Sequence, residues 1–159
     1  MQLPKTSRGR VLLAACLCAV VLVAVAAFER ARAYATGYPD LESATSAKIY
    51  TDRYEEYVDD LSGEDFDELM SIVGRLDPRG SRVAVGNLTP TTGDPPPMFS
   101  LTLSDDYVVR LVSYGYESRL IVGSGSWKVS SKALADLRGF YYRCYDRYWL
   151  PVAHEMGID

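Results

Sequence analysis

The sequence has little of the side-chain chemistry from which common catalytic and metal sites are built. Its 159 residues include a single histidine, and two of its three cysteines, Cys16 and Cys18, lie inside a long apolar run. Cys144 is therefore alone in the rest of the chain, which excludes an intrachain disulfide there and the paired spacing of a zinc site. We expect Cys144 to be a buried free thiol, and we predict no catalytic residue, no metal site and no cofactor.

Positive charge is also scarce outside the amino-terminal segment. Residues 1–33 hold five Lys/Arg against one Asp/Glu, a net charge of +4, whereas residues 34–159 hold 12 against 20, a net charge of −8. Nucleic acids are bound by basic surfaces, so we expect no nucleic-acid partner. The length suits one ordinary domain with a short additional segment.

The strongest positive signal is an unbroken run of 18 apolar residues, Val11–Phe28. As a helix it would span about 27 Å at roughly 1.5 Å per residue, close to the ~30 Å hydrocarbon core of a bilayer. Three cations precede the run and two follow it, which favours an amino terminus in the cytoplasm. We therefore expect a basic cytoplasmic segment (1–10), a transmembrane helix (11–28) and an extracytoplasmic body.

Two other fates for this segment stay open. Ala31 and Ala33 form an A-R-A sequence before Tyr34, as a signal-peptidase site would, and cleavage there would secrete the body. The residues 13–16 spell a lipobox, but the apolar run continues past Cys16, where a lipoprotein should turn polar. Because the run exceeds the usual ~7–15-residue core of a cleaved signal, a retained anchor is the favoured interpretation.

The body after the anchor is patterned as one small α+β domain. Residues 29–46 are rich in small and turn-forming residues and predict a linker, which leaves 47–150 for the domain and 151–159 for a tail. Apolar residues recur at helical spacing from Phe66 to Leu76, with Ser62 as the expected N-cap and Asp65 as its capping-box partner. A second helix is expected over 132–149, ended by Pro151.

Alternating and β-rich segments predict the strands. A weak one is expected at 48–54, and stronger ones at 82–88, 99–103, 107–114, 119–122 and 127–129. The last four are joined by connections too short for parallel crossovers, so they predict an antiparallel meander. The expected architecture is a small antiparallel sheet packed against two helices.

The order of these segments resembles a known class of domains. LSGEDFDELMSIVGRLDPRG, a proline-rich loop, FSLTLSDDYVVRLVSYG, SGSWKVSS and a closing helix are similar to small exported or membrane-tethered α+β domains of Gram-positive bacteria, whose function is unknown. The resemblance covers residues 47–148. It implies a fold and a location at the cell envelope, and it implies no active site.

Several acidic and polar clusters are better explained by structure than by chemistry. The acidic stretch 52–68 does not fit the calcium-binding EF-hand, because placing Gly63 at its sixth position puts Val58 at its first. We expect it to be a solvated helix entry. Asp105 and Asp106 fit a turn, and His154 fits an exposed tail.

The most informative candidate surface is an aromatic stripe on the last helix. Arg138, Tyr142, Tyr145 and Trp149 fall at helical spacing on a face rotated from the apolar one. These residue types dominate binding hot spots. The alternative is that the domain wraps this helix on more than one side. We therefore expect a binding or structural domain that engages another envelope component, such as an envelope protein or the cell wall; alternatives are an envelope enzyme that uses carboxylates alone and an anchored inhibitor or immunity-type protein.

Overall fold

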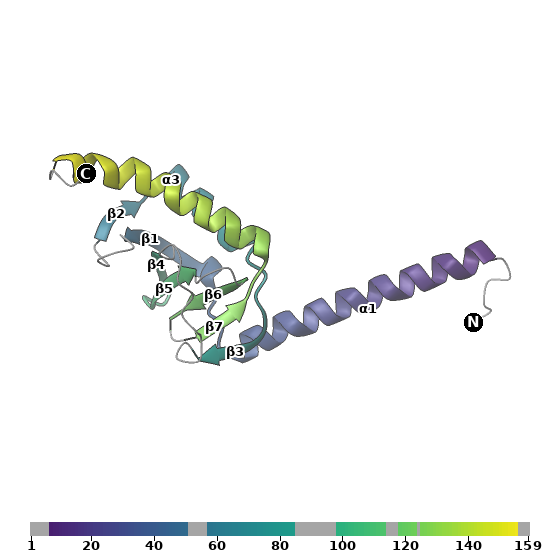
Figure 1. Cartoon of the computed structure of the whole chain (residues 1–159). Coiled ribbons are helices and arrows are strands. Elements are labelled where there is room, and N and C mark those ends of the chain that lie inside the picture. The colour runs from purple at the N-terminus through teal and green to yellow at the C-terminus, as the bar shows by residue number, and fades with distance from the viewer. Residues whose placement is uncertain (1–6, 51–56, 85–97, 114–117, 124, 156–159) are drawn as a thin grey trace.

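The computed structural model describes residues 7–50, 57–84, 98–113, 118–123 and 125–155. These residues form an α+β fold, as predicted: a long amino-terminal helix, a seven-stranded antiparallel sheet and two further helices (Figure 1). The elements are α1 (Ser7–Ala35), the short 3-10 helix η1 (Leu41–Ser43), β1 (Ala44–Tyr50), β2 (Tyr57–Leu61), α2 (Glu64–Val73), β3 (Arg79–Ala84), β4 (Met98–Leu103), β5 (Val108–Ser113), β6 (Arg119–Val122), β7 (Gly125–Lys128) and α3 (Ser131–Glu155).

The sheet has the strand order β2-β1-β4-β5-β6-β7-β3. Strands β4 to β7 follow one another in sequence and in space, so the predicted meander is confirmed. Their side chains alternate as half-buried strands should: Val109 and Leu111 are buried, whereas Val108 and Arg110 are exposed. The N-terminal part of the chain supplies β1 to one side of this meander, and β3 closes the other side.

Helix α3 lies across the buried face of the sheet and supplies much of the core. Helical spacing in the sequence places Leu134, Leu137, Tyr141, Cys144 and Tyr148 on one face of this helix, the apolar seam; the first four are buried and Tyr148 is half-buried. Aromatic packing joins the seam to β4: the ring of Phe99 stacks on Phe140 at 5.8 Å and meets Tyr141 edge-on at 5.7 Å. The helix is therefore fixed on the sheet mainly by buried apolar contacts.

Helix α2 begins differently from the expected capping box. Its N-cap is Gly63, with a φ of 55° and no side-chain cap, so the predicted cap at Ser62 is wrong. The carboxylate of Asp65, the expected capping partner, instead contacts Arg147 and Tyr148 on α3. Tertiary contacts have replaced the local hydrogen bond that the sequence pattern favours.

The predicted linker is wrong over residues 34–46, which are built into the fold. Tyr38 and Leu41 are buried in the core, and β1 already begins at Ala44. The Gly and Pro residues that predicted a linker form turns on the surface of the domain. The weak strand at 48–54 corresponds to the end of β1, and its residues 51–54 lie outside the described residues.

Two boundaries also differ from the predicted ones. Strand β3 begins at Arg79 and not at Arg82, and residues 85–88 of the predicted strand are outside the described part. Helix α3 continues through Pro151 to Glu155, so the expected stop is wrong. Proline removes one helical hydrogen bond, and at this exposed helix end the carbonyl that loses its partner is open to water.

Candidate functional site

Helix α1 has two parts with opposite surroundings. Along the apolar run its side chains are exposed: Val20, Leu22 and Val23 are 65–69% accessible. The helix then enters the domain (Figure 1), and Ala33, five residues after the end of that run, is fully buried in the core. Among the described residues, one helix is long and apolar enough to cross a membrane, and it is this one.

The end of α1 is closed by a Schellman motif. The N–H of Tyr38 donates to the carbonyl of Ala33 at 3.1 Å, and the N–H of Gly37 donates to that of Tyr34 at 3.0 Å. Gly37 has a φ of 91°, which a residue with a side chain rarely adopts. The motif turns the chain directly from the helix into η1 and the sheet, so helix and domain are joined without a spacer.

Thr36 links this helix end to two strands. Its hydroxyl donates to the carbonyl of Ala33 at 3.0 Å and accepts from Trp127 Nε1 at 3.3 Å. It also accepts from the backbone N–H of Arg82 at 3.2 Å. Trp127 is 2% exposed, so its indole N–H needs such a partner inside the protein.

Aromatic rings complete the joint between α1 and the sheet. Tyr38 meets Trp127 edge-on at 5.4 Å and Tyr34 edge-on at 5.6 Å. Burial raises the pKa of the Tyr38 phenol, which therefore stays neutral. We refer to Ala33, Thr36, Tyr38 and Trp127 as the helix joint.

A pocket of about 240 Å³ lies beside the helix joint. Gly125 forms part of the pocket wall at a point where a side chain would not fit. A Cβ there would come within 2.4 Å of the Trp127 ring and 2.7 Å of Arg82 Nε. The described lining includes one guanidinium and no carboxylate, and the volume is below the ~300–1,000 Å³ of typical small-molecule sites. Its lining residues are Thr36, Gly37, Pro39, Arg82, Tyr107, Val109, Val122, Gly123, Gly125 and Trp127.

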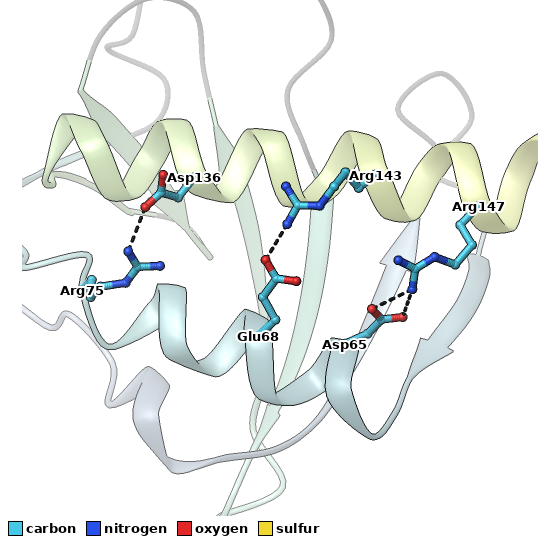
Figure 2. A network of polar contacts seen from close by, with 6 residues as sticks. All are labelled: Asp65, Glu68, Arg75, Asp136, Arg143 and Arg147. Atoms are coloured by element: carbon cyan, nitrogen blue, oxygen red, sulfur yellow. Dashed lines mark hydrogen bonds and ion pairs between the residues drawn. The ribbon is translucent and has the colours of Figure 1, made fainter.

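Charged residues on α2, in the turn that follows it (Arg75) and on α3 form three ion pairs (Figure 2). Arg75 pairs with Asp136 at 2.9 Å, Arg147 pairs with Asp65 at 2.8 Å, and Arg143 pairs with Glu68 between them. Five of the six side chains are 34–58% exposed, and Asp65 is 13% exposed. The pairs thus fix the two helices side by side in an antiparallel arrangement and leave no carboxylate of this group pointing into a cavity.

Asp65 has a more restrictive environment than the other acids of the ion pairs. The hydroxyl of Tyr148 and the guanidinium of Arg147 both donate to it. These contacts, the Tyr148 hydrogen bond first, lower the pKa of Asp65, although partial burial opposes the shift. Asp65 is therefore an ionised structural acceptor.

The four residues of the predicted aromatic stripe lie in different surroundings. Arg138 is half-buried, and its Nε donates to the Ser113 hydroxyl of β5 at 2.6 Å. Tyr145 is half-buried against the Tyr141 ring at 5.9 Å. Tyr142 is 40% exposed. The side chain of Trp149 lies outside the described residues. Tyr142 is thus the residue of the stripe that the structure shows open to solvent.

The remaining sequence candidates lie apart from one another. The N–H of Tyr107 donates to Asp105 at 3.1 Å and Asp106 has a φ of 62°, so the predicted turn is confirmed. His154 is exposed on the last turn of α3. Across the part of the chain that the structure describes, no three His, Cys, Asp or Glu residues converge as a metal site. Several acids of the stretch 52–68 lie outside that part.

Cys144 is confirmed as a buried free thiol. Burial raises the pKa of this thiol to about 12, so the reactive thiolate is not populated near neutral pH. The cysteine therefore acts as a small apolar core residue.

The helix joint is the feature that sequence reasoning missed. A signal was present, since Thr36-Gly37 follows an Ala-rich helix end at the position where a Schellman glycine is expected. Its buried partner Trp127 is 91 residues away from Thr36, and no local pattern indicates that pairing.

No protein-family model matches the chain, and no curated protein or solved structure is significantly similar to it. The resemblance to exported Gram-positive domains therefore stays a prediction.

Proposed function

We propose that the chain is a single-pass membrane protein that holds a binding or structural domain outside the cytoplasm, where it engages another envelope component. The observation that carries this proposal is the division of α1 into an exposed apolar part and a buried end. A helix with Val20, Leu22 and Val23 open on all sides is unfavourable in water and favourable in a hydrocarbon layer.

The helix joint supports retention of the anchor over cleavage. Cleavage after Ala33 would cut α1 within its last turn, at a residue with 0% exposure. It would also remove Glu29, whose carboxylate lies beside Gly80, and Arg30, which pairs with Glu42 at 3.9 Å. The domain is more completely packed with the end of α1 in place.

The charge distribution supports the orientation. Cations precede the apolar run, and the body that follows it carries a net charge of −8. The positive-inside tendency then retains the amino terminus in the cytoplasm and places the domain outside. On that domain Tyr142, an exposed aromatic of a type common in binding hot spots, is the proposed contact for a partner.

Topology is tested by fractionation and protease protection. Cells expressing the full chain with a carboxy-terminal tag are converted to protoplasts and treated with protease. We expect the chain in the membrane fraction and loss of the tag on treatment, while a cytoplasmic marker survives. Intact tagged protein in the medium with Tyr34 as its first residue would instead show secretion, and a protected tag would show the opposite orientation.

Partner binding is tested by site-specific photocrosslinking in the native envelope. A photoreactive amino acid is placed at Tyr142, and a matched control is placed at Asp67, which is exposed on α2. A crosslinked band that forms at position 142 and is absent at position 67 supports the proposed contact. Equal labelling at both positions, or no labelling at either in the native envelope, would contradict it.

A further inference from the structure

The contacts of α1 determine which end of the domain lies nearest the membrane. Thr36 contacts Arg82 of β3, whereas Glu29 lies beside Gly80, where an added Cβ would be 3.4 Å from the Glu29 carboxylate. The direction along β3 from Arg82 to Arg79 is therefore also the direction along α1 from Thr36 toward its apolar part. Because β7 and β6 pair in turn with β3 and β7, the Lys128 and Arg119 ends of those strands face the same way.

This end of the sheet lies at the height of the lipid headgroups. Glu29 directly follows the last residue of the apolar run. The polar layer of a bilayer is roughly 5–8 Å thick on each side, which corresponds to about four or five residues of helix rise. Glu29 and its neighbour Gly80 therefore fall within that layer when Val11–Phe28 spans the hydrocarbon core.

Three cations stand in a row across the strands at this end. Arg79 is paired in register with Lys128, and Lys128 is paired with Arg119. Lys132 adds an exposed cation four residues after Lys128, in the first turn of α3, which holds no acid. We name Arg79, Lys128 and Lys132 the basic end, because the Arg119 guanidinium is directed along β7 to Ser126, away from this end. Like charges directly opposite one another in a sheet are destabilising unless an anion compensates them.

The described residues supply carboxylate partners for only part of this positive charge. Arg79 pairs with Asp77, and Arg119 donates to the hydroxyl and the carbonyl of Ser126 at 2.9 and 3.1 Å. Among the described residues, Lys128 and Lys132 pair with no carboxylate. The opposite end of the domain has the reverse character, because α2 begins with three acids in its first turn.

We infer that the basic end docks onto anionic lipid headgroups of the leaflet from which α1 emerges. This inference rests on the proposed anchoring of α1. An anionic surface supplies the countercharge for the cation row, and it repels the acidic start of α2, which points away from the membrane. Both effects favour one upright orientation of the domain.

The docked state is tested with the full chain in lipid nanodiscs. Cys16 and Cys18 are replaced by alanine, and a donor fluorophore is placed through Ala135→Cys or, in a second protein, through Asp146→Cys. Both positions are exposed on α3, and they lie about 16 Å apart along its axis. An acceptor on the lipid headgroups then reports the height of each position above the membrane.

We expect energy transfer at position 135 to be higher in discs with about 30 mol% phosphatidylglycerol than in phosphatidylcholine discs, because the anionic surface favours docking. Position 146 should stay at low transfer in both. About 1 M NaCl, which reduces the screening length to ~3 Å, should abolish the difference.

Charge variants identify the residues responsible. Each cation near an anionic surface favours the bound state about fivefold, so Lys128→Gln with Lys132→Gln should lower the docked population about 25-fold. The control is Ser62→Glu with Ser104→Glu, two exposed positions that change the net charge equally, and it should retain docking. Equal transfer in both lipids for the unmodified chain, or equal loss in the control, would overturn the inference. Failure of the chain to enter discs at all would instead contradict the anchoring.

Discussion

Two long helices contact the same sheet in opposite ways. α1 uses its last two turns and a small buried joint in which Ala33, Tyr38 and Trp127 are at most 6% exposed. α3 packs on the sheet along the buried seam from Leu134 to Cys144 and adds three largely exposed ion pairs with α2 and the residues that follow it. The number of polar contacts that a helix makes is therefore a poor measure of how strongly it is held. An exposed ion pair contributes only about 0–1 kcal/mol to the free energy of unfolding, while a buried contact contributes several times that.

The largest effect should come from the buried ring of the helix joint. Trp127→Ala removes a buried ring that contacts both Tyr38 and Thr36, and we expect a loss of roughly 3–5 kcal/mol in the free energy of unfolding. Chemical denaturation of the full chain in detergent, followed by circular dichroism, measures it. Tyr107→Ala is the control, since Tyr107 lines the same pocket but is 59% exposed. If both variants lose the same free energy of unfolding, the buried ring of Trp127 contributes no more to stability than the exposed ring of Tyr107.

A smaller effect should come from the hydroxyl that the joint shares. Thr36→Val keeps the shape of the side chain and removes the acceptor of the buried Trp127 Nε1–H, whereas the Arg82 N–H that also donates to Thr36 is exposed to water. We expect a cost of about 1–3 kcal/mol, as for unsatisfied buried donors. Thr36→Ser, which keeps the hydroxyl, should recover most of it. If serine and valine are equally destabilising, packing of the methyl group and not hydrogen bonding is responsible.

The ion pairs should show a still smaller and pH-dependent effect. The pKa of Asp65 is lowered in the folded state, so its contribution is present above the unfolded pKa, about 3.9, and is lost as the pH falls through the folded value. Asp65→Asn should therefore cost about 1 kcal/mol near neutral pH and progressively less below about pH 4.

Thermal unfolding of the two proteins across this range measures the difference. Asp67→Asn, an exposed change in the same helical turn, is the control and should follow the unmodified chain. A gap between Asp65→Asn and the unmodified chain that stays constant down to the lowest pH would show that charge at Asp65 does not stabilise the fold.

The smallest effect should be at Tyr142. Because Tyr142 is 40% exposed and its ring makes one edge-on contact with Tyr141 at 5.4 Å, Tyr142→Ala should cost only about 0.5 kcal/mol. Leu137→Ala, on the buried side of the same helix, should cost roughly 2–5 kcal/mol. Thermal unfolding compares the two variants, and partner recovery is measured on the Tyr142 variant. If Tyr142→Ala unfolds as readily as Leu137→Ala, the ring belongs to the core.

Local sequence patterns predicted the elements in which buried side chains recur with the period of the strand or the helix. The alternation in β4 and β5 and the seam of Leu134, Leu137 and Tyr141 were visible because each repeats with the period of its own structure. Strand β2 was missed because its central Asp59 and Asp60 do not resemble a strand, and its position at the edge of the sheet makes such residues acceptable.

Long-range contacts account for what the sequence could not show. Asp65 satisfies the spacing of a capping box, yet side chains more than 80 residues away take its carboxylate. The aromatic stripe was correct in its helical spacing, but Ser113 on β5 determines that Arg138 points inward. Which side of a helix faces solvent depends on its neighbours in the fold, and one helix's own sequence does not contain that information.

The continuous passage from α1 through Gly37 into the sheet has a consequence for how a partner meets this domain. If α1 spans the membrane as proposed, the absence of a swivel between helix and domain means that rotation of α1 in the bilayer turns the whole body with it, and Tyr142 stays at a constant height. A partner confined to the same membrane then searches over position and one rotation angle in place of three. Less orientational entropy is lost on association, so a small contact area suffices for a specific encounter.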